Sequence, residues 1–214
     1  MASVVLRCRP VRDGATLTSR VNTNIQTIAV IGADAQGRAI ALACLRAKYA
    51  TILEDVSRSR LDDAVASLEQ NGVLGVNVAP GSLARHPSCG LRTTSVIEDA
   101  VRDADLIIES AADELEVKLE LFTLFDKFAK PGAILASTSA SLSIADMASV
   151  TFCADRCIGL RFDDVAQSNA IELVVTPETS TDTVVACREF ARRLNKEVRI
   201  VREGDPALKR GAAR

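Results

Sequence analysis

The chain has 214 residues and a formal net charge of −2, which is enough length for one sizeable α/β domain. It has no excess of positive charge, no Trp and only 3% aromatic residues. It therefore lacks the basic surface and the stacking rings with which proteins bind nucleic acids or anionic membranes. No apolar run approaches the roughly 18 residues that a membrane helix needs. We expect neither a nucleic acid nor a membrane as partner.

The cysteines and the single histidine do not form a metal-binding pattern. Six cysteines stand at positions 8, 44, 89, 153, 157 and 187, and His86 lies far from the closest pair. This spacing does not match a zinc site, so no metal is predicted. Reduced, mostly buried thiols in a cytoplasmic protein are the expected state, and no pattern singles out a reactive thiol.

Both ends of the chain differ in composition from its centre. Residues 1–24 contain four Arg and one acid, a weak resemblance to a transit peptide, and we favour a flexible N-terminal extension. The sequence after Val201, REGDPALKRGAAR, has no apolar periodicity and is predicted to be a basic tail over 202–214. Residues 25–201 are then the single folded domain.

Strand and helix patterns alternate through this domain, which is typical of a doubly wound parallel sheet. The predicted strands are 27–31, 51–55, 105–108, 133–136, 157–161, 171–175 and 197–201. The predicted helices are 35–47, 58–70, 95–102, 114–129, 143–149 and 181–195. The segment Asn71–Gly90 is rich in Gly, Pro and Ser and is predicted to be a loop.

The junction between the first strand and the first helix reads Gly32-Ala33-Asp34-Ala35-Gln36-Gly37. The dinucleotide fingerprint G-x-G-x-x-G needs its first Gly for the tight turn, its second for the approach of the pyrophosphate and its third for helix packing. Here Asp34 replaces the second Gly. These residues predict a Rossmann-type α/β fold with a mostly parallel sheet, and a cofactor turn that includes Gly32, Ala35 and Gly37.

The carboxylate of Asp34 opposes a bound phosphate. At about 4 Å, two such charges repel by about 4 kcal/mol at an effective dielectric constant of about 20. The helix dipole favours an anion by only about 0.3–1 kcal/mol. We favour an interpretation in which Asp34 caps the helix and fills the phosphate site with its own carboxylate. In the alternative, Asp34 turns away or pairs with Arg38.

Several blocks resemble, in order and spacing, the NAD-binding domain of the L-3-hydroxyacyl-CoA dehydrogenase family. They are IAVIGADAQG, ILEDVS, ADLIIESAADELEVKLELF, PGAILASTSASLSI, RCIGLRF and IELVVTPETSTDTV. The resemblance runs from about Ile25 to Val201, with a divergent patch at 71–92. It implies NAD as cofactor and an acyl-CoA, or another small hydroxy compound, as substrate. The family's helical domain, which forms its dimer, would begin where this chain ends.

The resemblance also assigns cofactor-binding residues. Asp55 ends the second strand, where the family's acid binds the adenosine ribose, which favours NAD over NADP. Glu109 and Lys118, with Asp113 between them, would line the nicotinamide side of the crevice. Without the family, Asp55 reads as an ordinary acid at a strand end and the others as the start of a helix.

The catalytic positions depart from the family. Its histidine base aligns with Arg161, which stays protonated and cannot accept a proton. The acid that orients this histidine survives as Glu172, so we expect an Arg161–Glu172 ion pair. Ser137 is retained in the family's Ser-Asn segment, whose Asn aligns with Thr138. Asp163-Asp164 makes the former substrate pocket more acidic.

Three hypotheses follow. The chain is an active NAD-dependent hydroxyacyl-CoA dehydrogenase, a different oxidoreductase in which Arg161 binds a substrate anion, or a non-catalytic descendant. We favour the third: a pseudoenzyme that binds NAD weakly or not at all, or that serves as an interaction module. A monomer and a homodimer through sheet edges or helix faces stay open.

Overall fold

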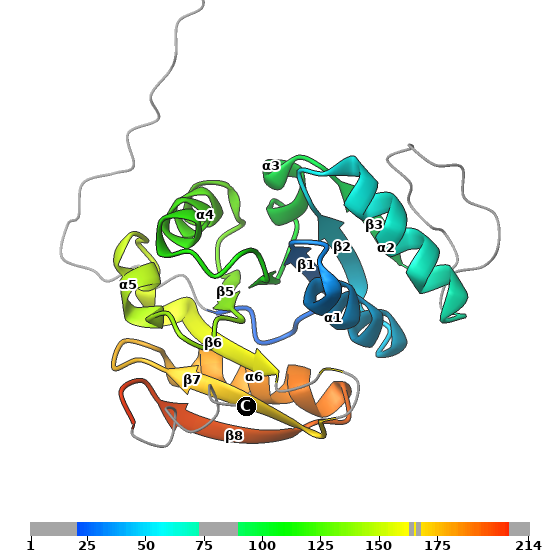
Figure 1. Ribbon diagram of the computed structural model, residues 1–214. Coiled ribbons are helices and arrows are strands. Elements are labelled where there is room, and N and C mark those ends of the chain that lie inside the picture. Colours follow the sequence, from blue (N-terminus) through cyan, green and yellow to red (C-terminus); the bar gives the residue numbers. More distant parts are fainter. Residues whose placement is uncertain (1–20, 73–89, 163–164, 166–167, 206–214) are drawn as a thin grey trace, which may run out of the picture.

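The computed structural model describes residues 21–72, 90–162, 165 and 168–205 of the chain. These residues are arranged around one twisted sheet (Figure 1). The strand order is β3-β2-β1-β4-β5-β6-β7-β8. Neighbouring strands are parallel except β6 and β7, which are antiparallel. The strands are β1 (Thr27–Ile31), β2 (Ala50–Glu54), β3 (Leu91–Thr94), β4 (Leu106–Glu109), β5 (Ile134–Ser137), β6 (Cys157–Phe162), β7 (Ala170–Val175) and β8 (Glu197–Arg202).

Helices cover both faces of the sheet and bury two apolar clusters. One cluster packs α1, α2 and α6 against the sheet, and the other packs α3, α4 and α5 against the opposite face. The helices are α1 (Ala35–Arg46), α2 (Arg58–Gln70), α3 (Ile97–Val101), α4 (Leu115–Phe128), α5 (Ile144–Ser149) and α6 (Thr181–Arg193), with a 3₁₀ turn, η1, at Ala154–Arg156. No helix among the described residues is long and apolar enough to cross a bilayer.

The predicted fold class is confirmed, and each predicted strand and helix is present, with ends that match the prediction or differ from it by one or two residues. One strand was not predicted. β3 has the sequence Leu91-Arg92-Thr93-Thr94, of which only the first and last residues are buried. Such a short run shows no clear apolar period, and its pairing with β2 determines its structure. Residues 73–89 of the predicted loop lie outside the described residues.

Residues on both sides of the predicted domain contact it. Val21 belongs to the apolar core, and the Asn22 N–H donates to the Gly132 carbonyl. At the other end, β8 continues to Arg202, and the Glu203 carboxylate accepts hydrogen bonds from the first N–H groups of α5. Residues 1–20 of the predicted extension (1–24) and residues 206–214 of the predicted tail (202–214) lie outside the described residues.

Asp105 joins the segment before β1 to the start of β4. Its carboxylate accepts from the backbone N–H groups of Gln26 and Thr27 at 2.8 and 2.9 Å, and from Asn22 Nδ2 at 2.6 Å. Lys130 Nζ lies 2.6 Å away. Burial raises the pKa of Asp105, but the hydrogen bonds from Lys130, Thr27 and Gln26 outweigh it and leave the pKa below its ordinary value.

We expect Asp105→Asn to lower the free energy of unfolding by about 1–3 kcal/mol at pH 7. The folded-state pKa lies below that of the unfolded chain, so the ionised Asp105 stabilises the fold above pH 3.8, its ordinary pKa. This contribution is lost as the pH falls toward the folded-state pKa, and the variant should show a flatter stability curve in that window. Urea unfolding at several pH values measures it, with the exposed Asp103→Asn as control. Coinciding curves for parent and Asp105→Asn would contradict this role.

Candidate functional site

The turn between β1 and α1 has the backbone geometry of a dinucleotide-binding turn. Gly32 has φ +104°, and a Cβ atom there would lie 2.8 Å from the Ser110 carbonyl oxygen. A Cβ on Gly37 would lie 1.9 Å from the Gly32 oxygen. Neither position accepts a side chain, so the first and third fingerprint glycines keep their structural roles.

Asp34, at the second fingerprint position, caps α1. Its backbone is extended, and its Oδ1 accepts a hydrogen bond from the Gly37 N–H at 2.8 Å. The predicted helix cap is therefore confirmed. Among the described residues, the ion pairs include none between Asp34 and Arg38. The helix terminus that would receive a pyrophosphate already holds a carboxylate.

Asp55, the predicted ribose ligand, holds the turn in place. Its Oδ2 accepts from the Ala33 N–H at 2.9 Å and its Oδ1 from the Ser57 N–H at 2.8 Å. Only 5% of this side chain is exposed, and Arg60 lies 3.6 Å from Oδ2. Burial and the neighbouring Asp55 charge raise the pKa of Glu54 to about 7. The predicted ribose carboxylate thus already has two backbone donors and a cation.

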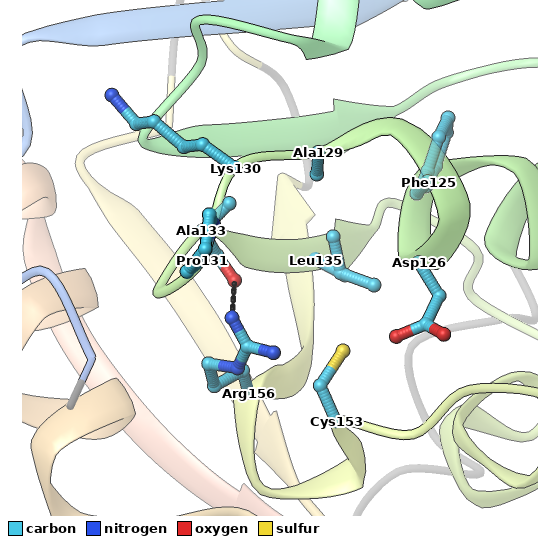
Figure 2. Close-up of a pocket in the computed structure, with 9 residues that line it drawn as sticks. All are labelled: Phe125, Asp126, Ala129, Lys130, Pro131, Ala133, Leu135, Cys153 and Arg156. Atoms are coloured by element: carbon cyan, nitrogen blue, oxygen red, sulfur yellow. Dashed lines mark hydrogen bonds between the residues drawn. The ribbon is translucent and has the colours of Figure 1, made fainter. Parts of the chain in front are cut away.

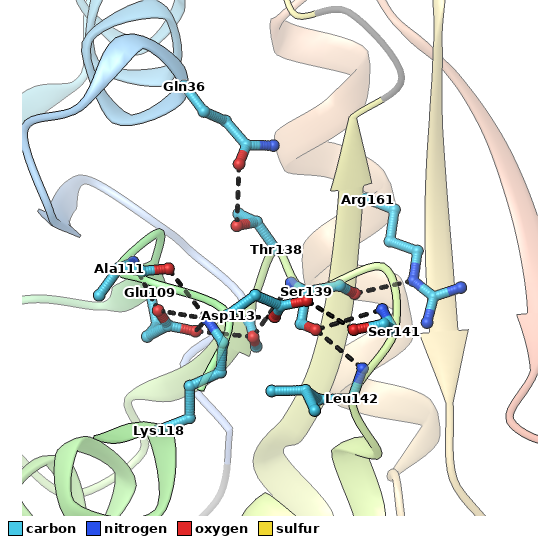
Figure 3. A network of polar contacts seen from close by, with 11 residues as sticks. Gln36, Glu109, Ala111, Asp113, Lys118, Thr138, Ser139, Ser141, Leu142 and Arg161 are labelled. Carbon is cyan, nitrogen blue, oxygen red and sulfur yellow. Dashed lines mark hydrogen bonds and ion pairs between the residues drawn. The ribbon is translucent and has the colours of Figure 1, made fainter. Parts of the chain in front are cut away.

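Glu109 and Lys118 form a buried ion pair at the carboxyl end of β4 (Figure 3). Lys118 Nζ lies 2.8 and 2.7 Å from the two Glu109 oxygens, and the two side chains are 1% and 0% exposed. Lys118 also donates to the Ala111 carbonyl, and Ser137 Oγ donates to Glu109 Oε2 at 2.7 Å. The structure brings these three predicted site residues together, and they satisfy one another.

The polar network extends from this pair into the loop after β5. Asp113 lies 3.8 Å from Lys118 and accepts from Ser141 Oγ at 2.6 Å. Burial raises the pKa of Asp113, but hydrogen bonds from Ser139 and Ser141, with the charges of Lys118 and Arg161, lower it below its ordinary value. Asp113 is therefore an ionised acceptor within the network.

Arg161 contradicts one prediction. In the antiparallel β6–β7 pairing it lies opposite Glu172, yet no ion pair joins them within the described residues. Its Nε instead donates to the Ser139 carbonyl at 2.9 Å (Figure 3), because that oxygen lies within reach in the loop after β5. Burial lowers the pKa of Arg161, while the charge of Glu172 opposes this. Asp163 and Asp164 lie outside the described residues.

Register places a second arginine on the same face. Glu172 is aligned with Arg199 of β8 as well as with Arg161 of β6. Aligned residues of neighbouring strands project to one side of the sheet. The place that the resemblance assigns to the family's histidine and glutamate is thus a cross-strand row of two arginines and one glutamate. The sequence reading missed Arg199, because only the pairing of β7 with β8 reveals its place.

Ser110 was also missed, and it bears on whether a dinucleotide fits. Its Oγ is the one buried side-chain oxygen or nitrogen in the described residues without a hydrogen-bond partner. It follows β4 and adjoins the Gly32 turn, at the crevice where Rossmann-type sheets bind ligands. The signal in the sequence was a hydroxyl directly after a buried strand. The turn and Ser110 fit a dinucleotide in shape, but the Asp34 carboxylate does not fit its pyrophosphate charge.

We expect Lys118→Met to lower the free energy of unfolding by about 3–5 kcal/mol, because it leaves the buried Glu109 carboxylate without its cation. Arg102→Ala is the matched control. It removes an exposed pair with Glu98 at 2.7 Å and should cost less than about 0.5 kcal/mol. Urea unfolding at pH 7 measures both. Equal losses in the two variants would show that the buried pair is not a structural requirement.

Comparison with known proteins gives the same family as the motifs. Residues 27–204 match the family "3-hydroxyacyl-CoA dehydrogenase, NAD binding domain". The 3-hydroxybutyryl-CoA dehydrogenase of Bradyrhizobium diazoefficiens is 33% identical over 188 residues, which cover 86% of this chain and 63% of that protein. The mitochondrial hydroxyacyl-coenzyme A dehydrogenase of Sus scrofa is 31% identical over 183 residues, covering 80% and 57%.

Solved structures agree with this result. The crystal structure of 3-hydroxybutyryl-CoA dehydrogenase from Escherichia coli has a TM-score of 0.72 at 27% identity, over 84% of this chain and 38% of that one. The chain spans less than two thirds of the length of the relatives named here. It belongs to the family of the 3-hydroxyacyl-CoA dehydrogenase NAD-binding domain.

Proposed function

We propose that this chain is a catalytically silent member of its family, which binds NAD weakly at most and acts through binding rather than through hydride transfer. The observation that carries the proposal is Arg161. It stands where the family resemblance places the histidine base, and its Nε is bonded to the Ser139 carbonyl.

A guanidinium at this position cannot remove the hydroxyl proton of a substrate. Arginine remains protonated in proteins, so it donates hydrogen bonds and accepts none. Loss of a positioned base typically lowers the rate by about 10²–10⁴. Glu172, which would orient a histidine, lies between Arg161 and Arg199 in the sheet.

The other carboxylates of the crevice are already engaged. Glu109 accepts from Lys118 and Ser137, and Asp113 accepts from Ser141. Each would have to break a short hydrogen bond before it could act as a base. The network therefore supports a structural role for both acids.

Weak cofactor binding rests on Asp34. A carboxylate and a phosphate about 4 Å apart repel by about 1 kcal/mol in water and by about 4 kcal/mol at an effective dielectric constant of about 20. Asp34 is exposed, so the lower part of this range applies. Its hydrogen bond to the Gly37 N–H also removes one donor from the helix terminus. Both effects disfavour the pyrophosphate.

An active NAD-dependent dehydrogenase is the second candidate. The unpaired Ser110 Oγ beside the Gly32 turn favours it, as does the similarity to 3-hydroxybutyryl-CoA dehydrogenases. In that case Arg161 would hold an anionic group of the substrate, and Glu172 would accept the proton. The two candidates differ in cofactor affinity and in turnover.

For cofactor affinity, we expect Asp34→Asn to strengthen NAD binding by about tenfold, because removal of about 1.4 kcal/mol of repulsion changes a dissociation constant by that factor. Asn caps a helix as well as Asp, and Gly costs only a few tenths of a kcal/mol, so Asp34→Gly should behave alike. Isothermal titration with NAD and NADH at low salt measures the affinities.

Asp62→Asn on the exposed side of α2 is the matched control, and should bind as the parent does. Micromolar binding by the parent, unchanged in both Asp34 variants, would overturn the closed phosphate site and favour the second candidate.

For turnover, we expect the parent to form no NADH from NAD and 3-hydroxybutyryl-CoA above the blank rate. The double variant Asp34→Asn/Arg161→His restores an acceptor near Glu172 and should gain about 10²-fold or more over that background. Arg199→His in the Asp34→Asn background changes the other arginine of the row and should gain nothing. Substrate-dependent turnover by the parent that Arg161→His abolishes would show that Arg161 serves catalysis.

A further inference from the structure

A small pocket lies at the amino ends of β5 and β6, opposite the end of the sheet that carries the Gly32 turn. Its walls come from the end of α4, the loop before β5 and the segment before β6. Figure 2 shows three functional groups around this hollow: the Cys153 thiol, the Asp126 carboxylate and the Arg156 guanidinium. Arg156 Nη1 donates to the Ala133 carbonyl at 3.3 Å, which fixes the cation beside the pocket.

A second thiol, that of Cys157, lies close to Cys153 in the fold. Cys157 begins β6, and the η1 turn between the two cysteines folds the chain back, so that Cys157 Sγ lies 3.5 Å from the Cys153 carbonyl oxygen. Thr151 Oγ1 lies 3.7 Å from the same sulfur. Both cysteines are reduced and buried, with 3% and 0% of their surface exposed.

The two thiols differ in acidity. A hydrogen bond from the Cys157 thiol lowers the pKa of Cys153 and burial opposes this. The positive charge of Arg156 lowers the pKa further, while Asp126 raises it through its charge and a hydrogen bond, and the net shift is downward. The same hydrogen bond, together with burial, raises the pKa of Cys157. Cys153 is thus the more acidic of the two thiols.

Two other cysteines are the natural comparison. Cys44 and Cys187 are completely buried in the core beneath α1 and α6. Burial raises the pKa of both, that of Cys187 to about 12. Neither lines the pocket. Among the four described cysteines, only Cys153 lines the pocket and has both a cation and a second thiol nearby.

We propose that Cys153 is a site of reversible oxidation, at which a small peroxide enters the pocket and reacts, and that Cys157 then closes a disulfide with it. The Cys153 thiolate attacks the peroxide, an S–O bond forms as the O–O bond breaks, and hydroxide leaves to give a sulfenic acid. The Cys157 sulfur attacks the Cys153 sulfur, and the S–O bond breaks. The leaving oxygen departs as water with the Cys157 proton. In total, two thiols and hydrogen peroxide give one disulfide and two waters.

The burial of Cys153 limits the reagents that can reach it. With 3% of its surface exposed, it should exclude bulky electrophiles and admit a peroxide. Arg156 would stabilise the thiolate and the departing hydroxide. The site therefore discriminates by size as well as by acidity.

The test uses the full chain with Cys8→Ser and Cys89→Ser, since both residues lie outside the described part. Hydrogen peroxide at pH 7 should remove two hydrogen atoms from the intact mass, and dithiothreitol should restore them. Trypsin cleaves after Arg156, so the disulfide should join two peptides that are separate in the reduced protein. Cys153 should be consumed at least about tenfold faster than Cys44 or Cys187.

Single variants assign the order of events. In Cys157→Ser, a 1,3-dione should trap a sulfenic acid on Cys153. In Cys153→Ser, Cys157 should stay reduced, while Cys44→Ser should oxidise as the parent does. Circular dichroism checks that each variant is folded. Glutathione added to the same reaction shows when the peroxide has acted. The proposal would be overturned if Cys153 were still reduced once that glutathione is completely oxidised, or if Cys157 were oxidised in Cys153→Ser to the same extent as in the parent.

Discussion

The buried Glu109–Lys118 ion pair is the constraint around which the carboxyl end of the sheet is arranged. Two charges removed from water are tolerated only where each finds its partner and further hydrogen bonds. Ser137 and the Ala111 carbonyl supply those bonds. Because the partners come from β4, α4 and β5, the pair fixes the relative positions of three elements. The side chains next to the pair are therefore held in fixed positions as well.

The same pattern of internal satisfaction recurs around the crevice. Asp34 accepts a hydrogen bond from the first turn of α1, Asp55 accepts one from the turn before α1, and Arg161 donates one to the loop after β5. Groups that a cofactor or substrate would otherwise engage are already bonded within the chain. Ser110 Oγ is the exception among the buried side chains described. A ligand-binding crevice normally leaves several such groups to its ligand, and this contrast supports a binding function weaker than that of an enzyme.

Predictions from sequence succeeded where one local rule decides the structure. Buried apolar runs identified the strands apart from β3, and an acid before a helical segment identified the Asp34 cap. The expected Arg161–Glu172 ion pair was wrong for a different reason. Strand register made the two residues neighbours, but the direction of a long side chain depends on every acceptor within reach. Ser139 lies 22 positions away in sequence and supplied a closer one.

The thiol pair shows the same limit. Two cysteines four residues apart gave no metal pattern, and the sequence did not predict the η1 turn between them. Asp105 was likewise expected only as the first residue of a strand, while its three donors from residues 22–27 became visible in the tertiary structure. Contacts between segments distant in sequence, rather than local pattern, distinguish these residues from other acids and thiols.

Asp34 connects the stability of the first helix with the weak NAD binding proposed above. A side-chain cap at a helix terminus contributes about 0.5–2 kcal/mol relative to Ala, but only a few tenths of a kcal/mol relative to the Gly of the fingerprint. With Gly at this position, as in the dinucleotide fingerprint, the donors of the helix terminus are left for a phosphate and the helix has no side-chain cap. When a domain no longer depends on its cofactor, a residue that satisfies the terminus from within is favoured. Under the proposed function, the carboxylate that opposes NAD is therefore also the one that caps the first helix.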